Sequence, residues 1–151
     1  MATNAEQIES MLDEQEITYF AGEGDRWMIP GESVFVCIGL FEDGEYVRFS
    51  GSVIADLDEL SSDECRAALR HFMELNDQIK LGRFCGFPKV NFEIGLPLED
   101  AEITSDQFHR CLSVTMASTA STENAPPVSS TEGSSEPFLL PHTSRLPPEC
   151  D

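Results

Sequence analysis

Basic side chains are scarce in this chain of 151 residues, which has 9 lysines and arginines against 28 acidic residues and a formal net charge of −19. Because contacts to phosphate depend on lysine and arginine, this balance excludes a general nucleic-acid binder and argues against an anionic membrane surface. No apolar run approaches the roughly 18 residues of a membrane span. The N-terminus, Met1 to Glu6, has neither the basic nor the apolar region of a secretory signal. These absences predict a cytoplasmic protein with no direct nucleic-acid or membrane contact.

Motifs for metals and cofactors are missing as well. No pair of the five cysteines has C-x-x-C spacing, the three histidines are scattered, and no glycine-rich phosphate loop is present. The acidic run that begins at Asp56 starts like an EF-hand loop, but Ser61 and Ala67 stand where Gly and Glu are required. Carboxylates are so numerous that no pair stands out as a catalytic dyad. We therefore expect no metal, no cofactor and no enzymatic activity.

The composition changes near Ala117. From Ala117 to Asp151, 17 of 35 residues are Ser, Thr or Pro. Such a stretch buries too little apolar surface to offset the entropy lost on ordering. The sequence therefore predicts a folded domain over residues 1–116 and a disordered tail over residues 117–151.

Three capping boxes, each followed by an apolar stripe, predict three helices. The boxes begin at Thr3, Ser61 and Thr104. Asn76 lies on the apolar stripe of the second helix, where its amide needs a partner. We expect a structural hydrogen bond from Asn76 to a neighbouring loop or strand.

Strands are predicted between these helices. The segments are residues 17–20, 27–29, 33–41, 46–55, 83–87 and 89–98, with the last two paired across Pro88. With three of the four segments before the second helix counted as strands, the predicted order of elements is α-β-β-β-α-β-β-α. Strands joined by hairpins form antiparallel sheets, so the predicted fold class is α+β with helices packed on an antiparallel sheet.

The pair Asp43-Gly44 between two Val-, Ile- and Phe-rich runs predicts a hairpin with a tight turn. This turn sets the register and places Ile38 opposite Phe49 on an apolar face that must meet the helices. The other face pairs Gly39 with Arg48, and it also carries side chains that a solvated face does not need. Those side chains are Phe35, Cys37, Phe41, Tyr46 and Ile54.

An apolar second face needs a cover, because sizeable exposed patches usually mark interaction sites. One alternative is a cover from the same domain, such as the first helix or the tail. The other is a partner chain, either a second copy in a homodimer or an extended client peptide. On this second alternative, the five residues are candidate protein-binding residues.

The order of elements and several short motifs resemble the YbjN domain of the type III secretion chaperone-like group over residues 4–116. The motifs lie at residues 26–30, 75–84, 96–98 and 104–108. The most specific is the Leu75-Asn76 pair closing the second helix, followed by Gly82-Arg83-Phe84. The nearest kin are expected among cyanobacterial and plastid-type relatives.

This resemblance implies a chaperone-like α+β fold with no cofactor and no established reaction. Chaperones of this group are small acidic cytoplasmic homodimers that hold a partner's segment in extended form. The resulting hypothesis is a non-enzymatic protein- or peptide-binding module, either a chaperone or a YbjN-type regulator. The alternative is an acidic mimic that occupies a nucleic-acid-binding partner, whose affinity salt would lower more steeply than that of a hydrophobic clamp.

Overall fold

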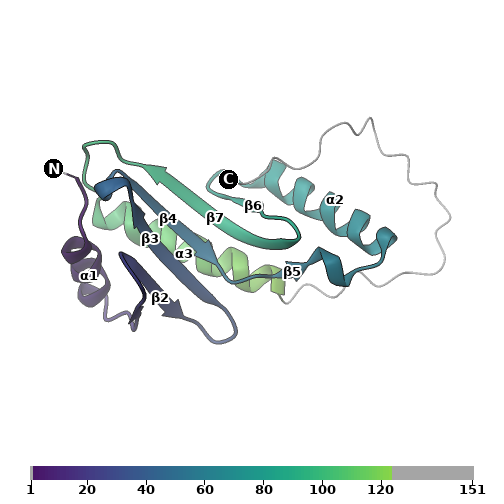
Figure 1. Cartoon of the computed structure of the whole chain (residues 1–151), viewed down its shortest axis with the longest axis horizontal. Coiled ribbons are helices and arrows are strands. Elements are labelled where there is room, and N and C mark those ends of the chain that lie inside the picture. Colours follow the sequence, from purple (N-terminus) through teal and green to yellow (C-terminus); the bar gives the residue numbers. More distant parts are fainter. Residues whose placement is uncertain (1, 124–151) are drawn as a thin grey trace.

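The computed structural model describes residues 2–123, and the part of the predicted tail from residue 124 to 151 lies outside the described residues. Within residues 2–123 a seven-stranded antiparallel sheet packs against three α-helices (Figure 1). The predicted α+β class is therefore confirmed.

More strands are present than the predicted order contains. The elements are α1 (Ala5–Glu14), β1 (Phe20–Ala21), β2 (Arg26–Pro30), β3 (Phe35–Phe41), β4 (Tyr46–Gly51), β5 (Ala55–Asp56), α2 (Ser62–Gln78), β6 (Arg83–Cys85), β7 (Lys89–Pro97) and α3 (Ser105–Glu123). Short 3-10 turns at Glu42–Gly44 and Leu57–Glu59 precede β4 and α2. Five strands rather than three precede α2. Both short segments predicted near residues 17–20 and 27–29 form strands, and the strand predicted over residues 46–55 breaks after Gly51 and resumes at Ala55.

The first four strands and β7 lie in the spatial order β1-β2-β3-β4-β7, so β4 pairs with a strand that follows it only after α2 and β6. Short β5 pairs with the start of β7, and β6 also pairs with β7. This last pairing was predicted for the segments on either side of Pro88. Every pairing in the sheet is antiparallel.

The predicted hairpin register of β3 and β4 is confirmed from Val36 opposite Gly51 to Phe41 opposite Tyr46. Asp43 (φ 53°, ψ 33°) and Gly44 (φ 95°) both adopt the positive φ that the tight turn requires. Gly44 also lies so close to Thr3 that a Cβ atom there would collide with the Thr3 carbonyl. The Asp-Gly turn therefore fixes both the register and the approach of the N-terminal segment.

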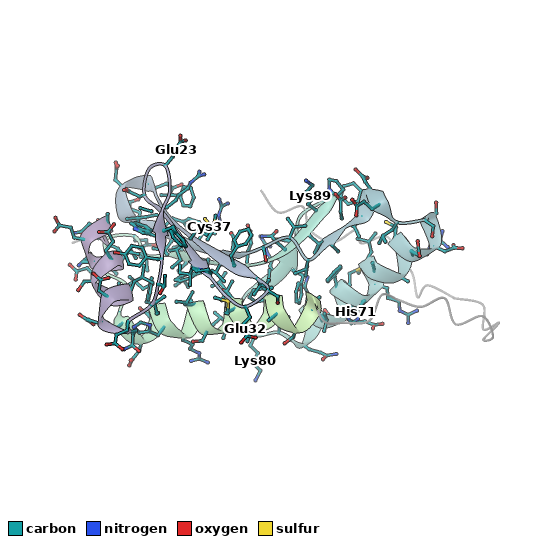
Figure 2. All side chains as sticks on the ribbon, turned by 90° about the horizontal axis from the view of Figure 1, so that it is seen from below. Glu23, Glu32, Cys37, His71, Lys80 and Lys89 are labelled. Atoms are coloured by element: carbon teal, nitrogen blue, oxygen red, sulfur yellow. The ribbon has the colours of Figure 1, made fainter. Side chains whose placement is uncertain are left out.

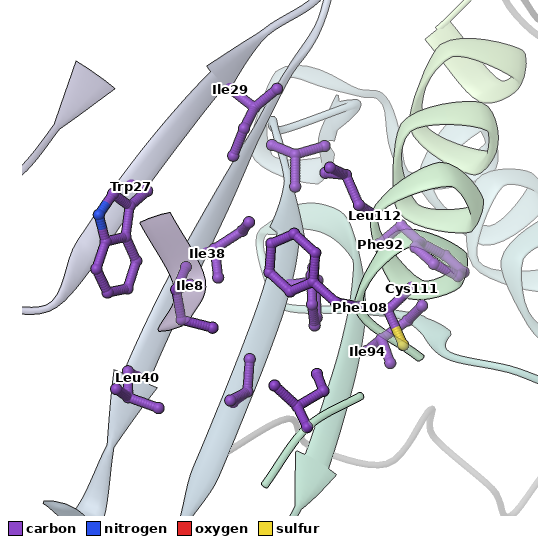
Figure 3. Packing of buried hydrophobic residues seen from close by; sticks show 14 of the residues in the cluster. Ile8, Trp27, Ile29, Ile38, Leu40, Phe92, Ile94, Phe108, Cys111 and Leu112 are labelled. Carbon is purple, nitrogen blue, oxygen red and sulfur yellow. The ribbon is translucent and has the colours of Figure 1, made fainter. Parts of the chain in front are cut away.

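One face of the sheet forms the core. Alternate residues of β3 and β4, such as Ile38 and Phe49, are fully buried, and α3 contacts β3, β4 and β7 on this side. The rings of Phe49 and Phe108 meet edge to face with centroids 5.5 Å apart. Figure 3 shows Phe108 of α3 among the buried side chains of the sheet. Burial of each such side chain contributes roughly 1.5–3 kcal/mol.

The first helix is fixed to the same face by Ile8 and Leu12, which are fully buried. The indole Nε1 of Trp27 on β2 donates a hydrogen bond to Glu9 on α1 at 3.0 Å. The capping box of α1 lies one residue later than predicted, with Asn4 as the cap. Thr3 is instead buried, and its hydroxyl accepts a hydrogen bond from the Ile103 N–H at 2.9 Å.

The second helix packs beside β6. Three aromatic rings form a row that begins at Phe72. The ring centroids of Phe72 and Phe84 are 5.4 Å apart, and those of Phe84 and Phe92 are 5.2 Å apart. The hydrogen bonds predicted for Asn76 are confirmed: its Nδ2 donates to the Phe84 carbonyl at 2.9 Å, and its Oδ1 accepts the Phe84 N–H at 2.7 Å. One side chain therefore satisfies both backbone groups of a residue on β6.

The boundary predicted at residue 116 is wrong, because α3 continues to Glu123. Thr119 is fully buried, and a Cβ atom at Gly51 would collide with its hydroxyl. The buried hydroxyls of Thr115 and Thr119 donate to the carbonyls four residues earlier, at 2.8 and 2.7 Å. A Ser- and Thr-rich helix can enter a core in this way, since its hydroxyl groups are satisfied internally.

Replacing Asn76 tests the link between α2 and β6. We expect Asn76→Ala to lower the free energy of unfolding by about 2 kcal/mol, because two backbone groups lose their partner. Denaturant titration measures the change. Asp77→Ala alters the adjacent exposed position and should stay within about 0.5 kcal/mol of the parent chain. Equal effects of the two variants would contradict the structural role of Asn76.

Two truncations test the revised boundary. Removal of every residue after Met116 deletes buried Thr119 and should lower the melting temperature by at least about 4 °C, the shift expected for roughly 1 kcal/mol. Removal of the residues after Glu123 leaves Thr119 in place and should change the melting temperature by less than the first truncation does. Calorimetry of the two shortened chains compares them, and equal melting temperatures would remove residues 117–123 from the folded unit.

Candidate functional site

The side of the sheet opposite α3 carries a second set of side chains, which we call the open face. Figure 2 shows Cys37 on the side of the sheet away from α3. Since side chains alternate along a strand and directly paired residues share a face, the strand pairing identifies the other members. The open face contains Phe20, Arg26, Met28, Phe35, Cys37, Phe41, Tyr46, Arg48, Ser50 and Glu93.

Large apolar side chains on this face are exposed to solvent. Phe20 is 61% exposed, Met28 43% and Phe35 42%. Phe20 pairs with Met28, and Met28 pairs with Cys37, so these residues form a row across β1, β2 and β3. Phe35 is two residues from Cys37 on β3, so the exposed side chains occupy neighbouring positions of one face, whereas isolated exposed apolar residues would need no explanation.

The structure brings together four of the five residues selected from the sequence. Phe35, Cys37 and Phe41 come from β3, and Tyr46 comes from β4. The Phe41 and Tyr46 rings belong to directly paired residues, and their centroids are 6.2 Å apart. That these residues bind a protein stays a prediction.

The assignment of Ile54 to this face is wrong. The Ser52 N–H donates to the Phe35 carbonyl at 2.8 Å, and the pairing with β7 is interrupted after Ser50 and resumes at Ala55. The Ile54 N–H consequently donates to the Val90 carbonyl at 2.9 Å, and the Ile54 side chain packs against the core. The expected pair of Ser33 with Ile54 therefore does not form.

Two arginines that no sequence pattern identified as site residues lie at the centre of the open face. Arg26, Gly39 and Arg48 occupy directly paired positions across β2, β3 and β4. The ring of Phe41 lies over Gly39, with the Cζ atoms of Arg48 and Arg26 at 4.8 and 5.8 Å from its centroid. A shallow hollow of about 50 Å³ opens here, lined by Arg26, Cys37, Gly39, Phe41, Arg48 and Ser50.

The Glu93 carboxylate on the open face accepts hydrogen bonds from uncharged side chains. Glu93 accepts hydrogen bonds from the Ser50 hydroxyl at 3.1 Å, the Cys85 thiol at 3.2 Å and the Asn91 amide at 3.4 Å. Among the described residues, no carboxylate lies within ion-pair distance of Arg26 or Arg48. The hollow is therefore a local concentration of positive charge on a strongly acidic chain.

The remaining chemistry of residues 2–123 is limited. Within this range no group of three His, Cys, Asp or Glu side chains could hold a metal ion, and no helix is long and apolar enough to cross a membrane. Burial raises the pKa of the Cys111 thiol, which favours its neutral form. The open face offers apolar surface, aromatic rings and two guanidinium groups.

Comparison with known proteins identifies the fold. No protein-family model and no curated protein sequence matches the chain. The structure of YbjN, a putative transcription regulator from E. coli, is similar with a TM-score of 0.62 and 13% identity, covering 82% of this chain and 90% of YbjN. The structure of the ExsC–ExsE complex is similar with a TM-score of 0.58 and 16% identity, covering 85% of this chain and 99% of the matched chain.

These likenesses confirm the fold that the resemblance implied, because the chain shares its α+β architecture with both structures. Sequence identities of 13% and 16% establish the fold alone. The cyanobacterial or plastid-type branch stays a prediction. The chain therefore shares its fold with YbjN and with the matched chain of the ExsC–ExsE complex.

Proposed function

We propose that this chain is a non-enzymatic protein-binding module whose open face holds an extended segment of a partner protein. The observation that carries this proposal is the patch of exposed Phe20, Met28 and Phe35 at neighbouring positions of the sheet face opposite α3. Exposure of such a patch is unfavourable in an isolated chain, and a partner that covers it removes it from water.

The shape of the face supports a protein partner over a small molecule. Sites for drug-sized ligands are concave and have volumes of roughly 300–1,000 Å³. The hollow beside Phe41 has about 50 Å³, and the exposed residues around it lie on a broad sheet. A surface of this form suits many shallow contacts with another chain.

The structural neighbours support the same class of function. The ExsC–ExsE structure is a complex, and YbjN is described as a putative transcription regulator. Both descriptions are compatible with a module that acts by binding. The alternative of a nucleic-acid mimic would need a phosphate-like array of carboxylates, whereas the centre of the open face carries Arg26 and Arg48.

Substitutions on the open face should affect binding more than folding. We expect Phe35→Ser and Phe41→Ser to weaken association by about 1 kcal/mol or more, as truncation of an aromatic anchor does. The free energy of unfolding should fall by less than about 1 kcal/mol for exposed Phe35. Phe49→Ser is the core comparison and should lose about 3–5 kcal/mol of stability.

Denaturant titration gives the stability of each variant, and affinity capture from native cells with quantitative mass spectrometry gives the binding. Leu60→Ser, which changes an exposed apolar residue just before α2, is the matched surface control. Partners should be lost from Phe35→Ser and retained by Leu60→Ser. Equal capture by both variants, or a Phe35→Ser stability loss equal to that of Phe49→Ser, would show that the open face is not the binding surface.

We also expect the chain to self-associate as a dimer with two-fold symmetry, which is the commonest symmetry of homo-oligomers. Sedimentation velocity at micromolar concentration should give the mass of a dimer, and Phe35→Ser should leave that mass unchanged if the open face is reserved for a partner. A monomer across this range would remove the dimer. Dissociation by Phe35→Ser would instead make the open face an interface between copies and overturn the partner-segment proposal.

A further inference from the structure

We propose that the hollow beside Phe41 recognises one carboxylate side chain, from Asp or Glu, in the partner segment bound to the open face. This inference rests on the proposed function and adds the chemistry that the partner must present. It follows from the placement of two arginines, one aromatic ring and one glycine.

The two guanidinium groups are positioned by the sheet itself. Arg26 and Arg48 are the direct cross-strand neighbours of Gly39, so both side chains project from the same row of the open face. Gly39 has no side chain between them, and the Phe41 ring occupies the space above its Cα atom. Both Cζ atoms lie within 6 Å of that ring, the range of a cation–π contact.

An arginine held against an aromatic ring still has its N–H groups available at the guanidinium edge. Each guanidinium carries five N–H donors in a planar fork, and a carboxylate matches that fork with two oxygens. Such charge-assisted bonds are shorter and stronger than those between neutral groups. The arrangement therefore provides oriented donors on the open face.

The protein does not supply the acceptor, although acidic residues outnumber basic ones by 28 to 9. Among the described residues, Arg26 and Arg48 form no ion pair, and Glu93 is occupied by Ser50, Cys85 and Asn91. Two like charges against one ring repel each other, and a bound carboxylate offsets that repulsion. An acceptor from the partner would complete the site.

Size and charge favour a single carboxylate over a larger anion. A hollow of about 50 Å³ accommodates only a few heavy atoms, since a single water needs roughly 10–15 Å³ of such space. A nucleic acid would bring many phosphates against a chain of net charge −19. One Asp or Glu brings a single charge, and the apolar residues around it in the partner segment would meet Phe35 and Met28.

A displayed library of random dodecapeptides, selected on the full chain and counter-selected on Phe35→Ser, tests the inference. The selected peptides should share an Asp or Glu flanked by apolar residues. In a synthetic copy of one such peptide, replacing that acid by its amide should weaken binding about tenfold, the scale of a hydrogen bond to a charged group. Fluorescence polarisation at low and high salt measures the dissociation constants, and salt should reduce the difference.

Variants of the chain complete a double-mutant cycle. Arg48→Met and Arg26→Met keep an apolar stem and should each weaken the acidic peptide several-fold, while the amide peptide should bind both variants as it binds the parent chain. Arg66→Met removes one charge from an exposed position on α2 and should leave both peptides unaffected. Arg48→Lys keeps the charge without the planar fork and should give an intermediate loss, which preserves the test if Arg48→Met does not fold.

The failures of the two proposals are distinguishable. If the selected peptides depend on Phe35 but have no acidic residue in common and bind Arg48→Met as tightly as the parent chain, the carboxylate site is wrong and the proposed function stands. If no peptide survives selection on the full chain and counter-selection on Phe35→Ser, the open face binds no extended segment and both proposals are overturned.

Discussion

Alternate residues of β3 and β4 meet opposite environments, because α3 lies along only one face of the sheet. Ile38 and Phe49 are fully buried beneath it, whereas Cys37 and Ser50, one position away on each strand, lie on the open face. A shift of the hairpin register by one residue would exchange the two faces and expose the core. The Asp43-Gly44 turn therefore determines which side chains build the core and which remain available to a partner.

Two glycines preorganise the open face. The Phe41 ring lies over Gly39 on its own strand, and the Tyr46 ring lies over Gly95 on β7. A side chain at either glycine would collide with the ring above it, so both rings rest on the backbone of the sheet. Aromatic groups that are already restricted lose little conformational freedom when a partner binds. The half-buried state of these rings is thus compatible with both a stable fold and a binding surface.

Local chemistry explains what the sequence could predict. The hairpin register followed from the conformational demands of Asp43-Gly44, and the role of Asn76 followed from an amide on an apolar stripe. Ile54 was placed wrongly because the break after Gly51 depends on pairing with β7, about forty residues away in the sequence. The helix beyond Met116 was missed because composition does not show that Thr119 would pack against Gly51.

The arginines of the hollow were missed for a related reason, since Arg26 meets Arg48 only through the pairing of β2 with β3. Their effect is local, because ions screen charges beyond a Debye length of about 8 Å at physiological salt. Elsewhere on the surface, beyond that range, the acidic side chains behind the net charge of −19 favour a partner that is basic overall. At contact the hollow selects an acidic side chain within that partner. The two ranges together would distinguish a basic protein that presents one carboxylate among apolar residues from basic proteins that do not.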